Sequence, residues 1–198
     1  SRAVIVSDAN VWPHYGKSVK ASLEAAGFTV CEYVVDAGED SKNLATLGDI
    51  LEFMAEQHLD RRDILVALGG GVIGDMAGFA AASFKRGIDF VQIPTTILSA
   101  VDSSVGGKTG VNLAQGKNLV GAFHQPSLVI CDTDTFASLP ARDYNAGMGE
   151  VIKYEVLGVP GLTDTDDIED IIASCIAYKA DIVAEDEFDT GRRQLLNL

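Results

Sequence analysis

A short apolar run that leads directly into a cluster of glycines constrains this chain more than any other sequence feature. Residues 64–68 read Ile-Leu-Val-Ala-Leu, and Gly69-Gly70-Gly71 follows without a break. A continuous apolar run of this length is typical of a strand that is buried on both faces of a parallel sheet. The glycines permit a sharp turn into residues 72–84, which have a helical pattern. A strand–turn–helix unit is therefore expected at the centre of the fold.

Strand-like and helix-like segments alternate over the first two thirds of the chain. The expected strands are residues 3–7, 29–35, 64–68 and 90–93, with a further short one at 128–131, and the expected helices are residues 15–26, 44–58 and 72–84. This order predicts a parallel sheet with helices on both faces.

The pattern becomes helical after residue 141, over residues 144–157 and 168–185. We therefore expect the α/β class, in which a Rossmann-like parallel-sheet domain over residues 1–140 precedes the start of a mostly α-helical domain over residues 141–198. The first residue leads straight into a strand and the last ones lie in an apolar run. We therefore expect the chain to be part of a longer protein, with the helical domain incomplete.

The charge balance limits the partners that the chain is expected to have. Lys and Arg total 15 and Asp and Glu total 29, which gives a formal net charge of −14. A surface this acidic is a poor general binder of nucleic acid or of anionic membranes, and the apolar runs are too short to span a bilayer. The scattered cysteines Cys31, Cys131 and Cys175 fit buried thiols in a reducing cytoplasm.

The glycine-rich turn is a candidate phosphate site. Gly69, Gly71 and Gly74 match the pattern G-x-G-x-x-G between an apolar strand and a helix. Glycines let the backbone approach a ligand closely, and the first turn of the helix offers unpaired N–H groups to an anion. The same spacing also suits a tight turn with close helix packing and no ligand. In the usual dinucleotide-binding fold this fingerprint follows the first strand, whereas here it follows the third.

A stretch without acidic residues is the second candidate. Residues 103–131 contain no Asp or Glu and include Lys108, Lys117 and His124. The glycines in this window would allow backbone amides to form anion-binding nests. We expect the window to hold a small anionic substrate, with the carboxylate of Asp102 beside it ordering a water or a hydroxyl. A flexible loop with solvated lysines is the alternative.

Glu150 and Lys153 lie three residues apart in an expected helix and share one of its faces. An ordinary surface ion pair also accounts for that spacing. The three histidines, His14, His58 and His124, have no metal-ligand spacing to one another. Spacing alone therefore indicates no metal site.

Taken together, these segments resemble the 3-dehydroquinate synthase family, within the sugar phosphate cyclases. The matching motifs follow one another along nearly the whole chain, at residues 38–42, 69–79, 94–96, 102–112, 116–118, 123–126, 139–142, 150–154, 179–180 and 191–198. A string of motifs in the same order is far more specific than the glycine turn alone.

The resemblance implies an enzyme of the shikimate pathway. Such an enzyme converts 3-deoxy-D-arabino-heptulosonate 7-phosphate, a sugar acid phosphate, into 3-dehydroquinate and phosphate. It uses NAD as a recycled catalyst that oxidises one carbinol and later returns the hydride, and zinc (or cobalt) to polarise the carbinol oxygen. Phosphate elimination, ring opening and an intramolecular aldol reaction complete the sequence. The resemblance also implies a cytoplasmic homodimer.

The resemblance assigns site residues as well. The residues that match the NAD site are Asp8, Asn10, Glu39, Lys42, Gly70, Gly71, Asp75, Thr95, Thr96 and Lys117. The residues that match catalytic and substrate contacts are Asp102, Lys108, Asn118, Lys153, Lys179, Arg193 and Asn197. Glu150 matches one zinc ligand, and Glu39 is expected to accept hydrogen bonds from ribose hydroxyls. This set suits a ligand with a carboxylate, a phosphate and several hydroxyls, in agreement with the acid-free window.

The sequence departs from the family pattern in several places. The family's two zinc histidines follow the Leu-Asn-Leu segment, and this sequence stops at Leu198. Residues 157–168 form a shorter stretch than in the family, Gly149 replaces an alanine, and Thr135 stands where an aromatic residue is usual near the cofactor. The alternatives are a sister sugar phosphate cyclase, a metal-dependent polyol dehydrogenase of the same superfamily, and a non-catalytic nucleotide-binding module. Arg193 and Asn197 favour the dehydroquinate branch.

Overall fold

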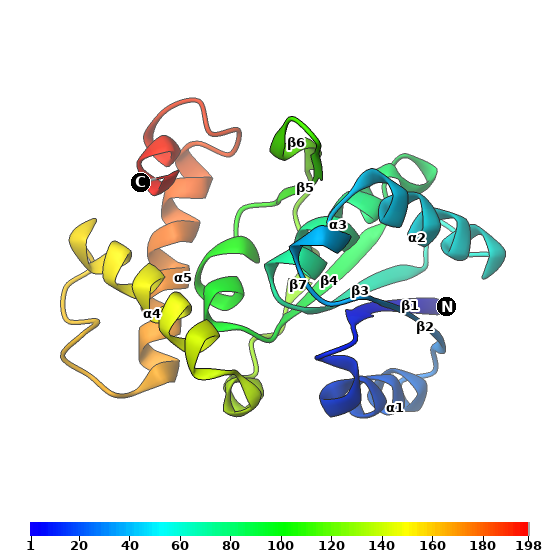
Figure 1. Cartoon of the computed structure of the whole chain (residues 1–198), viewed down its shortest axis with the longest axis horizontal. Coiled ribbons are helices and arrows are strands. Elements are labelled where there is room, and N and C mark those ends of the chain that lie inside the picture. Colours follow the sequence, from blue (N-terminus) through cyan, green and yellow to red (C-terminus); the bar gives the residue numbers. More distant parts are fainter. Residues whose placement is uncertain (198) are drawn as a thin grey trace.

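The computed structural model describes residues 1–197 and contains a five-stranded sheet in the order β2-β1-β3-β4-β7 (Figure 1). The strands are β1 (Arg2–Asp8), β2 (Thr29–Val35), β3 (Ile64–Gly69), β4 (Asp89–Pro94) and β7 (Leu128–Val129). Every neighbouring pair is parallel, which confirms the predicted fold class. The strand expected over residues 128–131 is shorter than predicted.

Helices cover both faces of this sheet (Figure 1). α1 (Lys17–Ala25) packs on one face against Ala3 and Ile5 of β1, whereas α2 (Leu44–Glu56) and α3 (Gly71–Ser83) pack on the other face against Val4 and Val6. All four of these β1 side chains are fully buried. Successive side chains of a strand point to opposite faces, so a continuous apolar strand needs a helix layer on each side.

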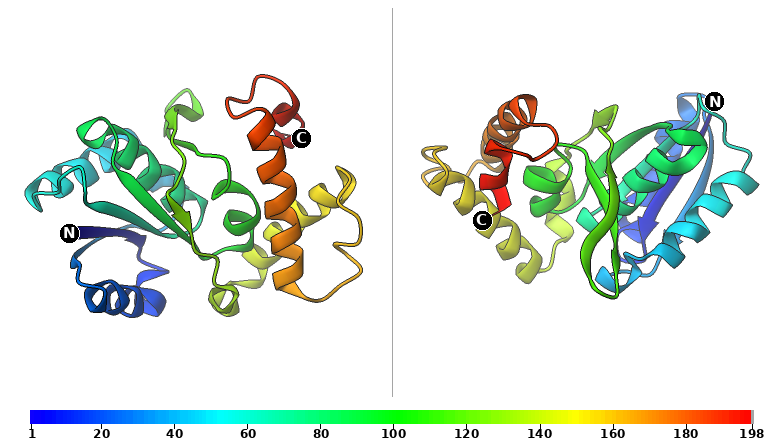
Figure 2. Two further views of the ribbon diagram at one scale, coloured as in Figure 1. Left: turned by 180° about the vertical axis from the view of Figure 1, so that it is seen from behind. Right: turned by 90° about the horizontal axis from the view of Figure 1, so that it is seen from above.

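The second part of the molecule is built from α4 (Ala141–Val156) and α5 (Ile168–Glu185), which stand beside the sheet (Figure 2). Their hydrophobic cluster includes Ala100 and Val101 of the π-helical turn Ser99–Ser103. Because this cluster draws on residues on both sides of position 140, the domain boundary proposed there stays a prediction. No helix within residues 1–197 is long and apolar enough to cross a membrane.

The structure adds a hairpin that the sequence did not predict. β5 (Lys108–Leu113) and β6 (Gly116–Phe123) pair antiparallel in a separate two-stranded sheet. Gly110 and Gly121 face each other across it, and a Cβ on Gly110 would lie only 2.6 Å from the carbonyl oxygen of Val120. Glycine is depleted in most strands, so the composition that permits this close approach also conceals the hairpin from pattern analysis.

Two glycines inside helices should respond in opposite ways to alanine. A Cβ on Gly78 of α3 would lie 2.5 Å from Cγ2 of Thr109 in β5, whereas a Cβ on Gly48 of α2 would meet nothing within 4 Å. We expect Gly78→Ala to lower the free energy of unfolding by about 1–3 kcal/mol through overpacking, and Gly48→Ala to raise it by about 0.4–1 kcal/mol. Chemical denaturation measures both, and equal effects would contradict the packing of β5 on α3.

Candidate active site

A cavity of about 550 Å³ opens between the β5–β6 hairpin and α5. Six residues assigned by the resemblance line it: Asp75, Asp102, Lys108, Asn118, Lys179 and Arg193. They come from α3, the π-helical turn, both hairpin strands, α5 and the C-terminal 3-10 helix Arg192–Asn197. The fold therefore gathers charged groups that are distant in sequence around one space.

Two donors from the helical part hold the carboxylate of Asp102. Nζ of Lys179 lies 2.5 Å from Oδ1 of Asp102 and 2.6 Å from its backbone carbonyl oxygen. The hydroxyl of Tyr154 shares its proton between the same Oδ1 at 3.2 Å and the carbonyl oxygen of Val101 at 3.0 Å. Burial alone would raise the pKa of the Asp102 carboxyl, but Lys179, Lys153 and Tyr154 together hold it below its usual value. Asp102 is therefore ionised at neutral pH and can accept a hydrogen bond from a ligand hydroxyl.

Both donors are deeply buried. The side chain of Lys179 is 7% exposed, and Tyr154 is fully buried. Burial lowers the pKa of Lys179 even though Asp102 attracts its proton, and burial together with the Asp102 charge raises the pKa of Tyr154. The Tyr154 hydroxyl therefore stays protonated over the physiological range and acts toward Asp102 only as a donor.

A second cluster centres on Lys42, whose side chain is 5% exposed. Its Nζ donates to Oδ2 of Asp75 and to Oδ1 of Asn118, both at 2.6 Å. Burial raises the pKa of the Asp75 carboxyl, and Lys42 offsets only part of that effect. The cluster joins one residue of the loop after β2 to one residue each of α3 and β6.

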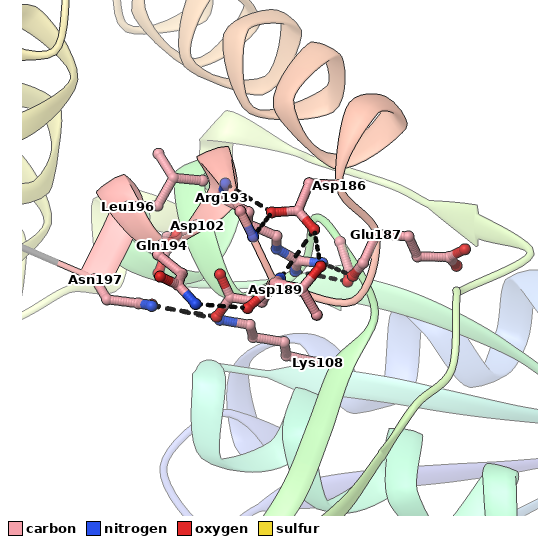
Figure 3. A network of polar contacts seen from close by, with 12 residues as sticks. Asp102, Lys108, Asp186, Glu187, Asp189, Arg193, Gln194, Leu196 and Asn197 are labelled. Atoms are coloured by element: carbon pink, nitrogen blue, oxygen red, sulfur yellow. Dashed lines mark hydrogen bonds and ion pairs between the residues drawn. The ribbon is translucent and has the colours of Figure 1, made fainter.

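Lys108 is paired with a carboxylate that sequence reasoning missed. Asp189, in the loop that follows α5, accepts from Nζ of Lys108 at 2.6 Å and from Nδ2 of Asn197 at 3.2 Å (Figure 3). Asp186 shapes the loop, because its Oδ2 accepts from the backbone N–H groups of Gly191 and Arg193 at 2.7 and 3.0 Å. The Lys108–Asp189 pair spans 81 positions, and no local sequence pattern marks such a contact.

Arg193 is fixed in the cavity wall and is only 1% exposed. Its guanidinium donates to the carbonyl oxygens of Gly106 at 2.7 Å and Glu187 at 2.5 Å, and it lies 5.8 Å from the centre of the Phe123 ring. Burial lowers the pKa of Arg193, and the surrounding acids, first among them Asp189, oppose that shift. Because arginine remains charged in proteins, this side chain keeps a fixed positive charge at the cavity.

The residues that match the NAD site lie mostly at one edge of the sheet. Asp8 is the last residue of β1, Glu39 and Lys42 follow β2, Gly70 and Gly71 follow β3, and Thr95 and Thr96 follow β4. Oδ1 of Asp8 accepts from the backbone N–H of Asn10 at 2.8 Å, which closes the turn after β1. Ligands of open α/β sheets bind at this carboxyl edge.

The turn after β3 fits a phosphate group. Gly70 precedes α3 with an extended backbone, and no side chain caps the helix. A Cβ on Gly70 would lie 3.3 Å from Cγ2 of Thr96, and one on Gly71 would lie 3.1 Å from Oγ of Ser103. The buried hydroxyl of Thr95 has no hydrogen-bond partner among the described residues. Open N–H groups and a free hydroxyl at this turn suit the pyrophosphate of a dinucleotide.

Glu39 is held by a donor that was not among the predicted site residues. Nδ2 of Asn112 donates to Oε1 of Glu39 at 2.8 Å, and Nζ of Lys117 lies 3.6 Å from the same oxygen. The hydrogen bond from Asn112 lowers the pKa of Glu39, and the charges of Lys42 and Lys117 add to this effect. Burial acts in the opposite direction but is outweighed. An ionised carboxylate at this position suits ribose hydroxyls as partners.

Glu150 does not lie in a metal centre formed by the described residues. It pairs with Lys153 along α4, and Nζ of Lys153 also donates to the carbonyl oxygen of Leu196 at 2.9 Å. Within residues 1–197, no three His, Cys, Asp or Glu side chains are grouped closely enough to hold a metal ion. These residues therefore do not by themselves fit a metal, and Glu150 stays a predicted ligand.

Tyr154→Phe should change the titration of Asp102 while keeping the packing of the ring. We expect the pKa of the Asp102 carboxyl to rise, because its ionised form loses a hydrogen bond, and stability to fall by about 1–3 kcal/mol because the buried carbonyl of Val101 also loses its donor. Carbon-13 NMR titration measures the first effect. Tyr178→Phe is the control, since that hydroxyl donates to Leu157 instead. An unshifted Asp102 in Tyr154→Phe would contradict the contact.

Comparison with known proteins gives this geometry a context. Residues 32–146 match the family model described as 3-dehydroquinate synthase N-terminal. The 3-dehydroquinate synthase of Caulobacter vibrioides is 49% identical over 210 aligned residues, which cover 100% of this chain and 57% of that protein. This chain therefore spans a little over half the length of the curated relative.

Solved structures of sister enzymes share the fold. A 2-deoxy-scyllo-inosose synthase complexed with carbaglucose-6-phosphate, NAD+ and Co2+ superposes with a TM-score of 0.90 at 30% identity, over 99% of this chain and 58% of that one. A 2-epi-5-epi-valiolone synthase from Streptomyces hygroscopicus with NAD+ and Zn2+ bound gives a TM-score of 0.88 at 28% identity, over 99% and 59%. Since the family model matches more than half of its residues, the chain belongs to the 3-dehydroquinate synthase family.

Proposed function

We propose that this chain forms the NAD-binding part and much of the substrate cleft of a 3-dehydroquinate synthase. Its substrate would be 3-deoxy-D-arabino-heptulosonate 7-phosphate, and its products 3-dehydroquinate and phosphate. The observation that carries the proposal is the convergence of Lys108, Lys179 and Arg193 on one cavity in a chain of net charge −14. Such a site suits a small ligand with two anionic groups and several hydroxyls.

The carboxyl edge of the sheet would hold the cofactor. Gly70 and Gly71 would meet the pyrophosphate through backbone N–H groups, Thr95 would donate its free hydroxyl, and Glu39 would accept from a ribose. Bound NAD would supply a hydride acceptor for one carbinol of the sugar and return the hydride later in the cycle. The Lys42–Asp75–Asn118 cluster joins this edge to the cavity, because Asp75 and Asn118 also line the cavity wall.

The cavity residues would bind and orient the sugar acid phosphate. Lys108 and Arg193 would meet its anionic groups, and a ligand anion at Lys108 would replace Asp189 there. Asp102, held ionised by Lys179 and Tyr154, would accept a proton or a hydrogen bond from a substrate hydroxyl. Glu150 would be one ligand of a bound metal, and residues 1–197 contain no group of three side chains that could hold the ion by themselves. A homodimer and a cytoplasmic location stay predictions from the resemblance.

A sister sugar phosphate cyclase is the second candidate, because the matched sister structures share the fold at 30% and 28% identity. The 49% identity to a 3-dehydroquinate synthase favours the dehydroquinate reaction. We expect the full-length protein to release phosphate from the heptulosonate phosphate without net accumulation of NADH. Turnover of a different sugar phosphate, or steady NADH formation as in a polyol dehydrogenase, would overturn the proposal.

Gly70→Val should abolish NAD binding while leaving the fold intact. The valine side chain would occupy the space in front of Thr96, where its Cβ would lie 3.3 Å from Cγ2, and would keep the pyrophosphate from the backbone. Calorimetry with NAD and far-ultraviolet circular dichroism measure the two effects. Normal NAD affinity in the folded variant would contradict the assignment of this turn.

Lys108→Ala should reduce kcat/KM by roughly 30- to 1,000-fold, because a charge-assisted contact to the substrate is lost in a partly desolvated site. The matched control is Lys85→Ala, since Lys85 forms an exposed ion pair with Asp60 at 3.1 Å. Steady-state kinetics on both variants decide the matter. Equal activity of the two variants would refute the role of Lys108.

A further inference from the structure

Asn112 holds three residues of the proposed sites at once. Its backbone N–H donates to the carbonyl oxygen of Lys42 at 2.9 Å. Its Nδ2 donates to Oε1 of Glu39, and its Oδ1 accepts from the backbone N–H of Asn118, both at 2.8 Å. One residue thus touches two residues matched to the cofactor site and one matched to the substrate site.

A local irregularity of the hairpin directs Asn112 toward these partners. Val111 pairs with Val120 and Leu113 pairs with Gly116, and the register shifts between Val111 and Leu113. Asn112 itself forms an isolated parallel bridge with Asn43, outside the hairpin. Irregularities of this kind redirect a side chain out of the regular pleat. The shift therefore lets Asn112 contact the loop after β2 through Nδ2 while its Oδ1 still accepts from Asn118 of the opposite strand.

Asn118 depends on this contact for its conformation. Its φ of +54° lies in the left-handed region, which costs about 1 kcal/mol for a residue other than glycine. Asn112 fixes the backbone N–H of Asn118, and Nζ of Lys42 binds its side chain at 2.6 Å. The two bonds hold the Asn118 carboxamide against Lys42, which also binds Asp75, and both Asn118 and Asp75 line the cavity.

We infer that Asn112 is a positioning residue that couples the cofactor edge to the substrate cavity, through Glu39 on one side and Asn118 on the other. The inference rests on the proposed function, because it takes Glu39 as a ribose contact and Asn118 as a substrate contact. Asn112 itself lines neither the cavity nor the turn after β3. Nδ2 of Asn112 contacts Glu39 of the cofactor site and Oδ1 contacts Asn118 of the substrate site, so a substitution can disrupt one contact and keep the other.

Asn112→Asp should damage the cofactor side and spare the substrate side. A carboxylate at position 112 still accepts from the N–H of Asn118, but it faces the carboxylate of Glu39 across a short distance. In the full-length protein we expect the Kd for NAD at pH 8 to rise roughly 10- to 100-fold, with KM for the sugar phosphate within about threefold of wild type.

The pH dependence of NAD affinity distinguishes a loss of positioning in Asn112→Asp from a general loss of structure. In Asn112→Asp the two facing carboxylates share a proton as the pH falls, so NAD affinity should recover between pH 8 and pH 5.5. In wild type the affinity should stay flat over the same range, because the amide of Asn112 keeps the pKa of Glu39 below its usual value. A destabilised fold would not regain affinity on acidification.

Two further variants complete the test. Asn112→Ala removes both side-chain contacts without adding charge, and we expect it to raise both the Kd for NAD and KM for the sugar phosphate about tenfold. Asn145→Asp is the matched control, because it makes the same change at an exposed position of α4 that contacts neither Glu39 nor Asn118. It should stay within twofold of wild type at every pH.

Calorimetry with NAD and steady-state kinetics with the sugar phosphate distinguish the two levels of failure. If wild type does not bind NAD, the proposed function fails and the inference with it. If wild type binds NAD and Asn112→Asp binds it equally well at pH 8, or shows no recovery at pH 5.5, the inference alone is wrong. If Asn112→Asp lacks a thermal unfolding transition, Asn112→Ala decides, and unchanged constants in that variant would contradict the role.

Discussion

The buried contact between Lys179 and Asp102 sets the arrangement of the site. Lys179 belongs to α5, whereas Asp102 belongs to the turn Ser99–Ser103 after β4, so the contact joins the helical part to the α/β part. An ammonium that is 7% exposed costs several kcal/mol to bury without a partner, and the carboxylate and carbonyl of Asp102 supply that partner. The contact therefore fixes α5 against this turn, and both of its residues line the cavity.

Charge pairing inside the molecule prepares the cavity for an anionic ligand. Lys42 and Lys179 are each paired with a buried or half-buried carboxylate, which holds them in place at little exposure. Lys108 differs because it is more exposed, at 44%, and its partner Asp189 lies on a loop. An incoming anion can compete for Lys108 more readily than for the other two. The rest of the chain is acidic and repels large polyanions, so these cations are available only to small anionic ligands that fit into the cavity.

The sequence pattern was sufficient for the sheet and its helices. A strand buried on both faces is a continuous apolar run, as residues 3–6 are, and the core residues of the helices follow the helical repeat. It was insufficient for the hairpin, whose facing Gly110 and Gly121 lack the side chains that mark a strand. The acid-free window did indicate where cations meet the cavity. The sequence did not predict the roles of Asp189 and Asn112, because both depend on contacts between segments that are far apart in the chain.

The most direct measurement is a crystal structure of the full-length protein with NAD and a non-eliminating phosphonate analogue of the heptulosonate phosphate. We expect the dinucleotide to run along the carboxyl ends of β1 to β4 with its pyrophosphate at Gly70. The phosphonate and carboxylate should contact Lys108 and Arg193, with Asp189 displaced from Lys108. Density for either ligand outside these contacts, or an intact Lys108–Asp189 pair with the analogue bound, would contradict this view of the site.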